Sequence, residues 1–410
     1  MCGRSVHVPY VIMAVYIVSG ARTPFGAFNG ALKTVPAPRL GAAASTAAIS
    51  KAGLSPADIE EAYIGTALQG GVGQAPARQV VLEAGCPDTT EATTINKVCA
   101  SGVKAIALAA NTIKLGDRDI MLAGGMESMS RAPLYLPRAV SFGDVQARDA
   151  ILADGLTDAG SQHQMGICAE HTAEVQKVSR TDQDAYALSS YDRAEAAWKA
   201  QLFSDEIAPV TITDRKGATT VAVDEEFSRL LRDKVPTLRP AFSASGTITA
   251  ANASTLSDGA AAVVLASEEA VQRRGLAPLA RIIGASLLTS YRRRGECAGG
   301  LCDRAVARNP ACACKGRAQD RRYRTVGDQR GVLCRCARQY APPGPQPCQG
   351  EHARRRGVAR TPARRIGRTH RRHACACARS RRVRRRGRVQ RAYCADQGGG
   401  AASAIVIQRM

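Results

Sequence analysis

The alternation of strands and helices in this chain runs from Ala14 to about Ser290 and then stops. Val15–Val18 is typical of a β-branched strand, and Leu40–Ala52 is typical of an Ala-rich helix that ends at a glycine. Similar pairs follow along the chain, and this alternation favours a mostly parallel sheet covered by helices on both faces. The sequence therefore predicts an α/β fold up to that point.

One stretch inside this region lacks the alternation. Residues from about 128 to 245 hold longer polar loops and an amphipathic helix over Gln183–Lys199, which is typical of an inserted lobe. The alternation returns with a buried strand at Gly259–Ala266. After Tyr291 neither strand-like nor helical periodicity is present, until a last strand-like run at Ala404–Ile407. The predicted organisation is an N-terminal extension (1–12), an α/β domain (13–275) with its inserted lobe, the start of a second α/β domain (276–290), an Arg- and Cys-rich segment without order (291–397) and a final strand (398–410).

Charge and cysteine are concentrated in the same late segment. The chain has a formal net charge of +22, and between Tyr291 and Gln397 there are 30 Lys and Arg against 6 Asp and Glu. That segment alone carries a net charge of +24 and ten of the 14 cysteines, so the rest of the chain is near neutral. Widely spaced cysteines in the rest are typical of reduced thiols in a cytoplasmic protein rather than of a disulfide framework. They are Cys2, Cys86, Cys99 and Cys168.

Signals for a membrane or for secretion are weak. No apolar run approaches the roughly 20 residues that a membrane span needs. An apolar patch at Val8–Ile12 is too short for the apolar region of a signal peptide and is not followed by a small-residue cleavage site. We interpret residues 1–12 as an extension ahead of an original start at Met13, with a weak signal peptide as the alternative.

Three interpretations of the basic segment compete. An RNA-binding tail would explain the arginines, but it would explain neither the ten cysteines nor the near absence of lysine, which occurs only at Lys315. A zinc-binding tail would use cysteine pairs, but pairs such as Cys312 and Cys314 have C-x-C rather than C-x2-C spacing. The third interpretation is translation of GC-rich DNA out of frame, which yields Arg, Ala, Gly, Pro and Cys.

The sharpest chemical motif is Asn96–Gly102, which precedes a helical run over Val103–Leu115. A cysteine at the first turn of a helix is close to the positive end of the helix dipole, and this lowers the pKa of its thiol. Small residues after Cys99 would let an acyl group approach the sulfur. The alternative is that Cys99 is a buried small apolar residue.

Further motifs stand beside this one in a fixed order. Together with Asn96–Gly102 they resemble the thiolase family of acyl-CoA acyltransferases, and the resemblance covers about residues 15–290 without a break. These motifs are Ser19–Gly26 (opening strand and loop), Gly124–Ser130 (strand end), Met165–Gly166 with Ala169–Glu170 (pocket segment), Gly246–Ser254 (turn that contacts coenzyme A) and Ser257–Ala260 (next strand).

The resemblance implies a fold and a reaction. The expected fold has two βαβαβαββ halves in a layered αβαβα arrangement, with an inserted loop lobe and a disrupted C-terminal half. Cys99 would accept an acyl group from acyl-CoA as a thioester, and a second acyl-CoA would attack it in a reversible Claisen condensation. Met165 and Ser254 would contact the substrate. Coenzyme A would be a substrate, with no other cofactor and no metal, and the in-frame protein would be a homodimer or homotetramer without a specific nucleic-acid partner or a membrane.

The family also needs a His in Gly-His-Pro, an Asn in Asn-Glu-Ala-Phe and a second Cys, and the printed C-terminal third shows none of these motifs. Codons chosen for residues 328–334 encode Ile-Asn-Glu-Ala-Phe-Ser when read one base later. The same step over residues 360–370 gives Gly-His-Pro-Leu-Gly-Ala-Ser-Gly-Ala-Arg, and over residues 307–316 it gives an amphipathic helix. Three matches at one offset and in family order predict a frameshifted segment and an inactive chain.

Two alternatives stay beside this interpretation. A decarboxylating ketoacyl synthase would share the nucleophile but would use two histidines, which the hidden Asn-Glu-Ala-Phe argues against. A non-catalytic RNA-binding protein would use the basic tail, although its charge is confined to one segment. His163 lies near the pocket segment, but a single imidazole without a partner is typical of a polar loop.

Overall fold

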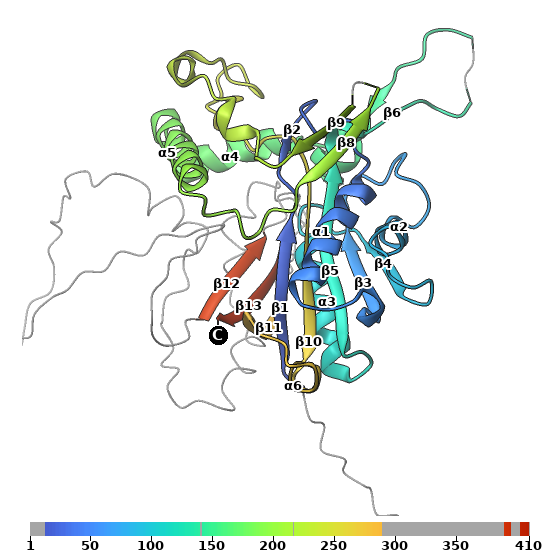
Figure 1. Ribbon diagram of the computed structural model, residues 1–410. Helices are drawn as coiled ribbons and strands as arrows, with labels where there is room; N and C mark the ends of the chain where they lie inside the picture. The colour runs from blue at the N-terminus through green and yellow to red at the C-terminus, as the bar shows by residue number, and fades with distance from the viewer. Residues whose placement is uncertain (1–12, 140–141, 216, 289–388, 395–401, 410) are drawn as a thin grey trace, which may run out of the picture.

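The computed structural model describes residues 13–139, 142–215, 217–288, 389–394 and 402–409. A nine-stranded sheet forms its centre, in the order β12-β13-β11-β1-β10-β5-β3-β4, with β2 paired to β10 (Figure 1). The strands are β1 (Val15–Arg22), β2 (Gly26–Ala27), β3 (Glu61–Gly65), β4 (Glu91–Ile95), β5 (Ile120–Ser128), β10 (Ser257–Ser267), β11 (Ala280–Leu288), β12 (Val389–Cys394) and β13 (Ala402–Arg409). The N-terminal extension of residues 1–12 lies outside the described residues.

The sheet is mixed rather than mostly parallel, which corrects the expectation from the sequence. Only β4, β3 and β5 pair in parallel, whereas β10 runs antiparallel to both β1 and β5. Helical crossovers connect the parallel strands, while β10 returns from the inserted lobe and enters the sheet from the opposite end. Hydrophobic periodicity reports which residues are buried and carries no information on strand direction, so the pattern alone missed this.

Helices cover both faces of the sheet, as expected. On one face α1 (Ala37–Lys51) and α2 (Pro76–Glu83) pack on side chains such as Leu122 and Val264. On the other face α3 (Ser101–Leu115) packs on the residues next to these in the strands, including Met121 and Leu265. The assignment to faces follows from the alternation of side chains along each strand.

Apolar composition makes α3 a special case. Among the described residues, Val98–Leu115 is the one stretch of helix that is long and apolar enough to cross a membrane. A core helix of a folded domain passes the same test of length and composition. Ala105, Ala109 and Ile113 of α3 are fully buried in the cluster on the sheet. Packing on the sheet therefore accounts for the apolar residues along this face of α3, without a membrane.

The inserted lobe lies beyond the end of β1 (Figure 1). Its elements are β6 (Leu134–Tyr135), β7 (Arg148–Asp149), a π-helical turn (Ile151–Leu156), α4 (Met165–Gln176), α5 (Arg180–Lys199), β8 (Val210–Asp214), β9 (Gly217–Val221) and the 3-10 turns Glu226–Ser228 and Arg232–Thr237. The helix expected over Gln183–Lys199 is the larger part of α5.

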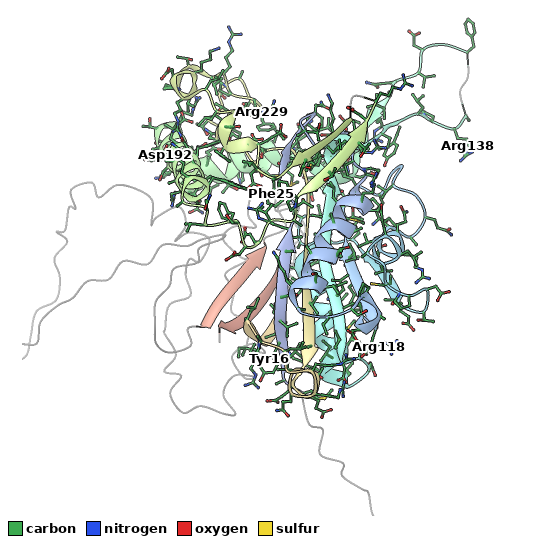
Figure 2. The ribbon with its side chains drawn as sticks, in the orientation of Figure 1. Tyr16, Phe25, Arg118, Arg138, Asp192 and Arg229 are labelled. Atoms are coloured by element: carbon green, nitrogen blue, oxygen red, sulfur yellow. The ribbon has the colours of Figure 1, made fainter. Side chains whose placement is uncertain are left out.

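One arginine joins the sheet to this lobe. The Arg22 guanidinium at the end of β1 lies 2.7 Å from Glu206 and 2.7 Å from Asp224. Asp224 also accepts a hydrogen bond from the indole nitrogen of Trp198 in α5, at 3.0 Å. The Arg22 side chain stacks over the ring of Phe25, which lies where the sheet meets the lobe (Figure 2).

The far end of the sheet is built from strands that are distant in sequence. β13 pairs antiparallel with β11, from Ala280 opposite Arg409 to Leu288 opposite Ala402. β12 pairs with β13 and lies within the segment 291–397, for which we expected no order. The free edge of β13 offers backbone donors and acceptors that β12 satisfies. Apart from β12, the segment lies outside the described residues.

We expect Asp119→Asn to destabilise the protein in a pH-dependent way. Asp119 accepts hydrogen bonds from the Ser267 hydroxyl at 2.6 Å and from Arg273 at 2.8 Å, and these bonds lower the pKa of its carboxyl. A lowered pKa contributes stability above the ordinary value of about 3.9, and the contribution is lost as the pH falls through the lowered value. Because the group is partly exposed, the loss at pH 7 should be about 1 kcal/mol.

Urea unfolding at pH 7 and pH 3 measures this difference. The exposed neighbour Asp117 supplies the matched control Asp117→Asn, for which we expect no change at either pH. A destabilisation by Asp119→Asn that is the same at both pH values would mean that the charge of Asp119 contributes nothing.

Candidate active site

Cys99 lies between the end of β4 and the start of α3, at the carboxyl ends of the parallel strands. Its side chain is exposed, so the alternative of a buried apolar residue is wrong for this position. The other described cysteines differ: burial raises the pKa of the Cys86 thiol, and burial together with the charge of Asp158 raises that of Cys168. Of the three, Cys99 is the exposed thiol, whereas Cys168 is half-buried and Cys86 is buried.

The turn before Cys99 has an unusual backbone. Val98 has φ of +49°, a left-handed conformation that costs a β-branched residue on the order of 1–3 kcal/mol. Its amide donates to the Asn96 side chain at 3.0 Å, and its carbonyl accepts from the Ser101 hydroxyl at 2.5 Å. The same hydroxyl accepts from the amide of Lys97 at 2.8 Å. These bonds close a tight turn that leads directly into α3.

Glycines in β3 and β5 allow the start of α3 to pack closely against the sheet. A Cβ on Gly65, the last residue of β3, would lie 2.5 Å from the carbonyl carbon of Ser101 and 2.7 Å from the amide nitrogen of Gly102. A Cβ on Gly125 of β5 would lie 3.3 Å from the Cα of Gly102. The small residues after Cys99 thus also serve packing, since Ala100 and Ser101 are buried against the sheet.

A glutamate holds the two predicted substrate segments together. The Glu170 carboxylate of α4 accepts from the amides of Thr247 and Ile248, each at 2.8 Å, and from the Thr247 hydroxyl at 3.0 Å. Met165 is the half-buried first residue of the same helix, and Ser254 is exposed on the loop that Thr247 opens. The pocket segment around Met165 and the turn over Gly246–Ser254 are therefore neighbours in the structure.

Comparison with known proteins decides the family. A family model described as the N-terminal domain of thiolase matches residues 15–269. The chain belongs to the thiolase family. A mitochondrial acetyl-CoA acetyltransferase of Aspergillus fumigatus is 51% identical over 279 residues, which cover 66% of this chain and 64% of that protein. The human mitochondrial acetyl-CoA acetyltransferase is 51% identical over 273 residues, with 66% of this chain and 64% of that protein covered.

A solved structure agrees with this assignment. The crystal structure of a thiolase from Ascaris suum in complex with coenzyme A superposes with a TM-score of 0.65 and 44% sequence identity, covering 68% of this chain and 72% of that one. The chain spans less than two thirds of the length of the Aspergillus fumigatus and human acetyl-CoA acetyltransferases. The described residues have the fold of the thiolase N-terminal domain, with a mixed sheet.

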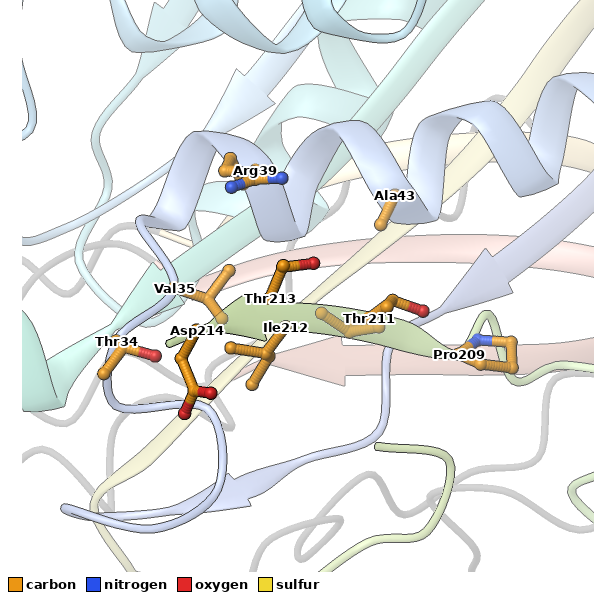
Figure 3. A pocket seen from close by; sticks show the side chains of 10 residues that line it. Thr34, Val35, Arg39, Ala43, Pro209, Thr211, Ile212, Thr213 and Asp214 are labelled. Carbon is orange, nitrogen blue, oxygen red and sulfur yellow. The ribbon is translucent and has the colours of Figure 1, made fainter. Parts of the chain in front are cut away.

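Two further features lie outside this candidate site. A groove of about 300 Å³ runs between α1 and β8 and contains none of the predicted site residues (Figure 3). Its lining is Thr34, Val35, Arg39, Ala43 and residues 209–214. His163 is an exposed loop residue, consistent with the interpretation from the sequence. Within the described residues, no group of three or more His, Cys, Asp or Glu is placed to hold a metal.

The sequence motifs contained supporting residues whose roles were missed. Glu127 and Glu170 both lie inside motifs that carried the family resemblance, and each carboxylate binds backbone amides of a distant loop. Asn252 is a third case, because its amide donates to Asp184 of α5 at 2.8 Å and its carbonyl accepts from the Thr249 amide at 2.8 Å. The available signal was that all three polar side chains lie inside the motifs that carried the resemblance.

Proposed function

We propose that this chain, read in frame, is an acetyl-CoA C-acetyltransferase that condenses two acyl-CoA molecules to 3-ketoacyl-CoA. The observation that carries the proposal is the exposed Cys99, placed at the strand ends and ahead of α3 within the family's nucleophile motif. The two acetyl-CoA acetyltransferases that are 51% identical over this region, and the coenzyme A complex of the Ascaris suum thiolase, support the substrate class.

The proposed reaction has two covalent steps. The Cys99 thiolate attacks the thioester carbonyl of the first acyl-CoA, and coenzyme A leaves as its thiolate while the acyl group stays on sulfur. The second acyl-CoA loses an α-proton, and its carbanion attacks the acyl-cysteine carbonyl and expels the Cys99 thiolate. Thiolysis is the same sequence in reverse. The proton transfers need the histidine and second cysteine that the family places in its C-terminal third.

The substrate site that we propose lies between Cys99 and the lobe. Met165 and Ser254 would contact the acyl-CoA, and Glu170 supports both of their segments by fixing the turn at Thr247. A homodimer or homotetramer of the in-frame protein, and a location in the cytoplasm, belong to the same proposal. Residues 291–397 of the printed chain do not contain the family's histidine, asparagine and second-cysteine motifs. We therefore propose that the printed chain is inactive.

Selective alkylation tests the role of Cys99. A brief treatment of the full chain with iodoacetamide at pH 7 should modify Cys99 about tenfold faster than Cys86 or Cys168, because Cys99 is exposed, Cys86 is buried and Cys168 is half-buried, and burial raises the pKa of both of these other thiols. In a frame-repaired chain, prior incubation with acetyl-CoA should protect Cys99. Peptide mass spectrometry measures both results.

Acetate in place of acetyl-CoA is the control, since it carries the acyl group without the thioester and should give no protection. Equal modification of the three cysteines, or no protection by acetyl-CoA in the repaired chain, would remove Cys99 from the role of nucleophile.

A further inference from the structure

We propose that Asn96 and Glu127 are positioning residues that hold Val98 in its left-handed conformation and thereby fix Cys99 at the start of α3. The use of Cys99 in acyl transfer rests on the proposed function. The positioning itself concerns only the backbone and the accessibility of the thiol, and it is argued from hydrogen bonds that join three strand ends.

The first step is the conformation of Val98. Its φ of +49° is one that β-branched residues rarely adopt, because the branched side chain then crowds the backbone. Such a conformation persists only where surrounding contacts hold it. Relaxation of Val98 to negative φ would rotate the chain immediately before Cys99 and shift the sulfur relative to the helix.

The second step is the contact that holds it. Asn96 follows β4, and its side-chain oxygen accepts from the Val98 amide at 3.0 Å while its side-chain nitrogen donates to the carbonyl of Ala67 at 3.2 Å. An amide side chain can make both bonds because it is at once donor and acceptor. Asn96 therefore ties the turn before Cys99 to the loop that follows β3.

The third step is the anchor of that loop. Glu127, near the end of β5, accepts from the Thr66 hydroxyl at 3.0 Å, the Ala67 amide at 2.7 Å and the Leu68 amide at 3.2 Å. Both carboxylate oxygens are used, and all three partners are donors. Burial raises the pKa of the Glu127 carboxyl, and the three donors oppose that rise. A glutamine here would turn an NH2 group towards a donor and weaken the loop.

These residues share one edge of the fold. β4, β3 and β5 are the three parallel strands of the sheet, with Gly65 opposite both Ile95 and Gly125, so their carboxyl ends meet. Each strand end supplies one part of the support: Glu127 near the end of β5, residues 66–68 after β3 and Asn96 after β4. The register of the sheet thus sets the position of the nucleophile through the side chains of Asn96 and Glu127.

The test is a mutant cycle on the full chain, read as the alkylation rate of Cys99 by iodoacetamide between pH 5 and pH 9. We expect Asn96→Ala to slow the reaction at pH 7 about tenfold and to move the midpoint of its pH dependence to higher pH, because the sulfur would lose its place at the start of α3, where the helix dipole favours the thiolate. The loss should shrink to less than about threefold in the Val98→Gly background, because glycine adopts positive φ without strain.

Further variants keep the result interpretable. Asn96→Asp retains the volume and the acceptor but loses the donor to Ala67, so an intermediate loss is expected. Glu127→Gln should slow the reaction in the same direction, and Val98→Gly should again restore most of the rate. Exposed Asn111 on α3 supplies the matched control Asn111→Ala, which should leave the rate unchanged. Circular dichroism shows that each variant is folded.

The outcomes separate this inference from the proposed function. A wild-type rate in Asn96→Asp or Asn96→Ala, or a loss that Val98→Gly does not restore, overturns the positioning role whatever acetyl-CoA does. If the rates follow the expected pattern while acetyl-CoA fails to protect Cys99 in the frame-repaired chain, the positioning stands and the proposed acyl transfer fails.

Discussion

Repair of the reading frame across residues 291–397 is expected to convert an inactive chain into a working thiolase. The printed chain presents the proposed nucleophile but not the family's Gly-His-Pro and Asn-Glu-Ala-Phe motifs or its second cysteine in their places. Residues that act as one catalytic unit fail together when one is removed, so we expect the repaired chain to exceed the printed one by at least about 10³-fold. The measurement is cleavage of acetoacetyl-CoA by free coenzyme A.

Two controls accompany this comparison. Cys99→Ala in the repaired chain should return the rate to that of the printed chain, which ties the gain to the proposed nucleophile. Equal expression and solubility of the two chains should be checked, so that turnover is compared per folded molecule. Comparable turnover by the printed and repaired chains would contradict the frameshift interpretation, since the arginine-rich segment would then supply the missing groups itself.

Gly65→Ala is expected to be strongly destabilising and to disturb the nucleophile. The new methyl group would lie 2.5 Å from the carbonyl carbon of Ser101 and 2.7 Å from the amide of Gly102, and backbone cannot rotate away as a side chain can. Either β3 or the start of α3 must move, at a cost of about 3 kcal/mol. Urea unfolding measures the loss of stability, and alkylation of Cys99 should slow because its helix has shifted.

A second glycine in the same contact supplies the comparison. A methyl group on Gly102 would have its nearest neighbours at 3.7 Å, an ordinary contact distance, so Gly102→Ala should be neutral or should stabilise the helix by up to about 1 kcal/mol. Similar stability changes for the two variants would show that the close approach of α3 to β3 does not determine the stability of this part of the fold.

The sequence identified the proposed nucleophile better than the architecture around it. Cys99 stands in a short motif whose consequences are local, and the structure places it exposed ahead of a helix, close to what the motif predicts. The direction of β10 depends instead on the path of the lobe between β5 and β10, which no local pattern encodes. The same limit applies to β12, whose pairing depends on the free edge of β13 rather than on its own periodicity.

The supporting residues were missed for a related reason. Glu127 binds the amide of Ala67, 60 positions earlier in the chain, and Glu170 binds the amide of Thr247, 77 positions later. Each was visible as part of a motif, but its partner is fixed only when strands and helices have been arranged in space. Sequence patterns therefore indicated which residues matter and left open what they hold.

The central position of β10 has a consequence for the order of folding. Val15 at the start of β1 pairs with Ser267, and Met121 in β5 pairs with Leu265, so both neighbours of β10 are synthesised long before it. Domains generally fold as units during synthesis from the N-terminus, and contacts this distant in sequence form slowly. Until β10 emerges, β1 and β5 each present an unpaired edge that a chaperone or another nascent chain could bind. Because Ser267 precedes Tyr291, the ribosome completes this sheet centre before it reaches the basic segment.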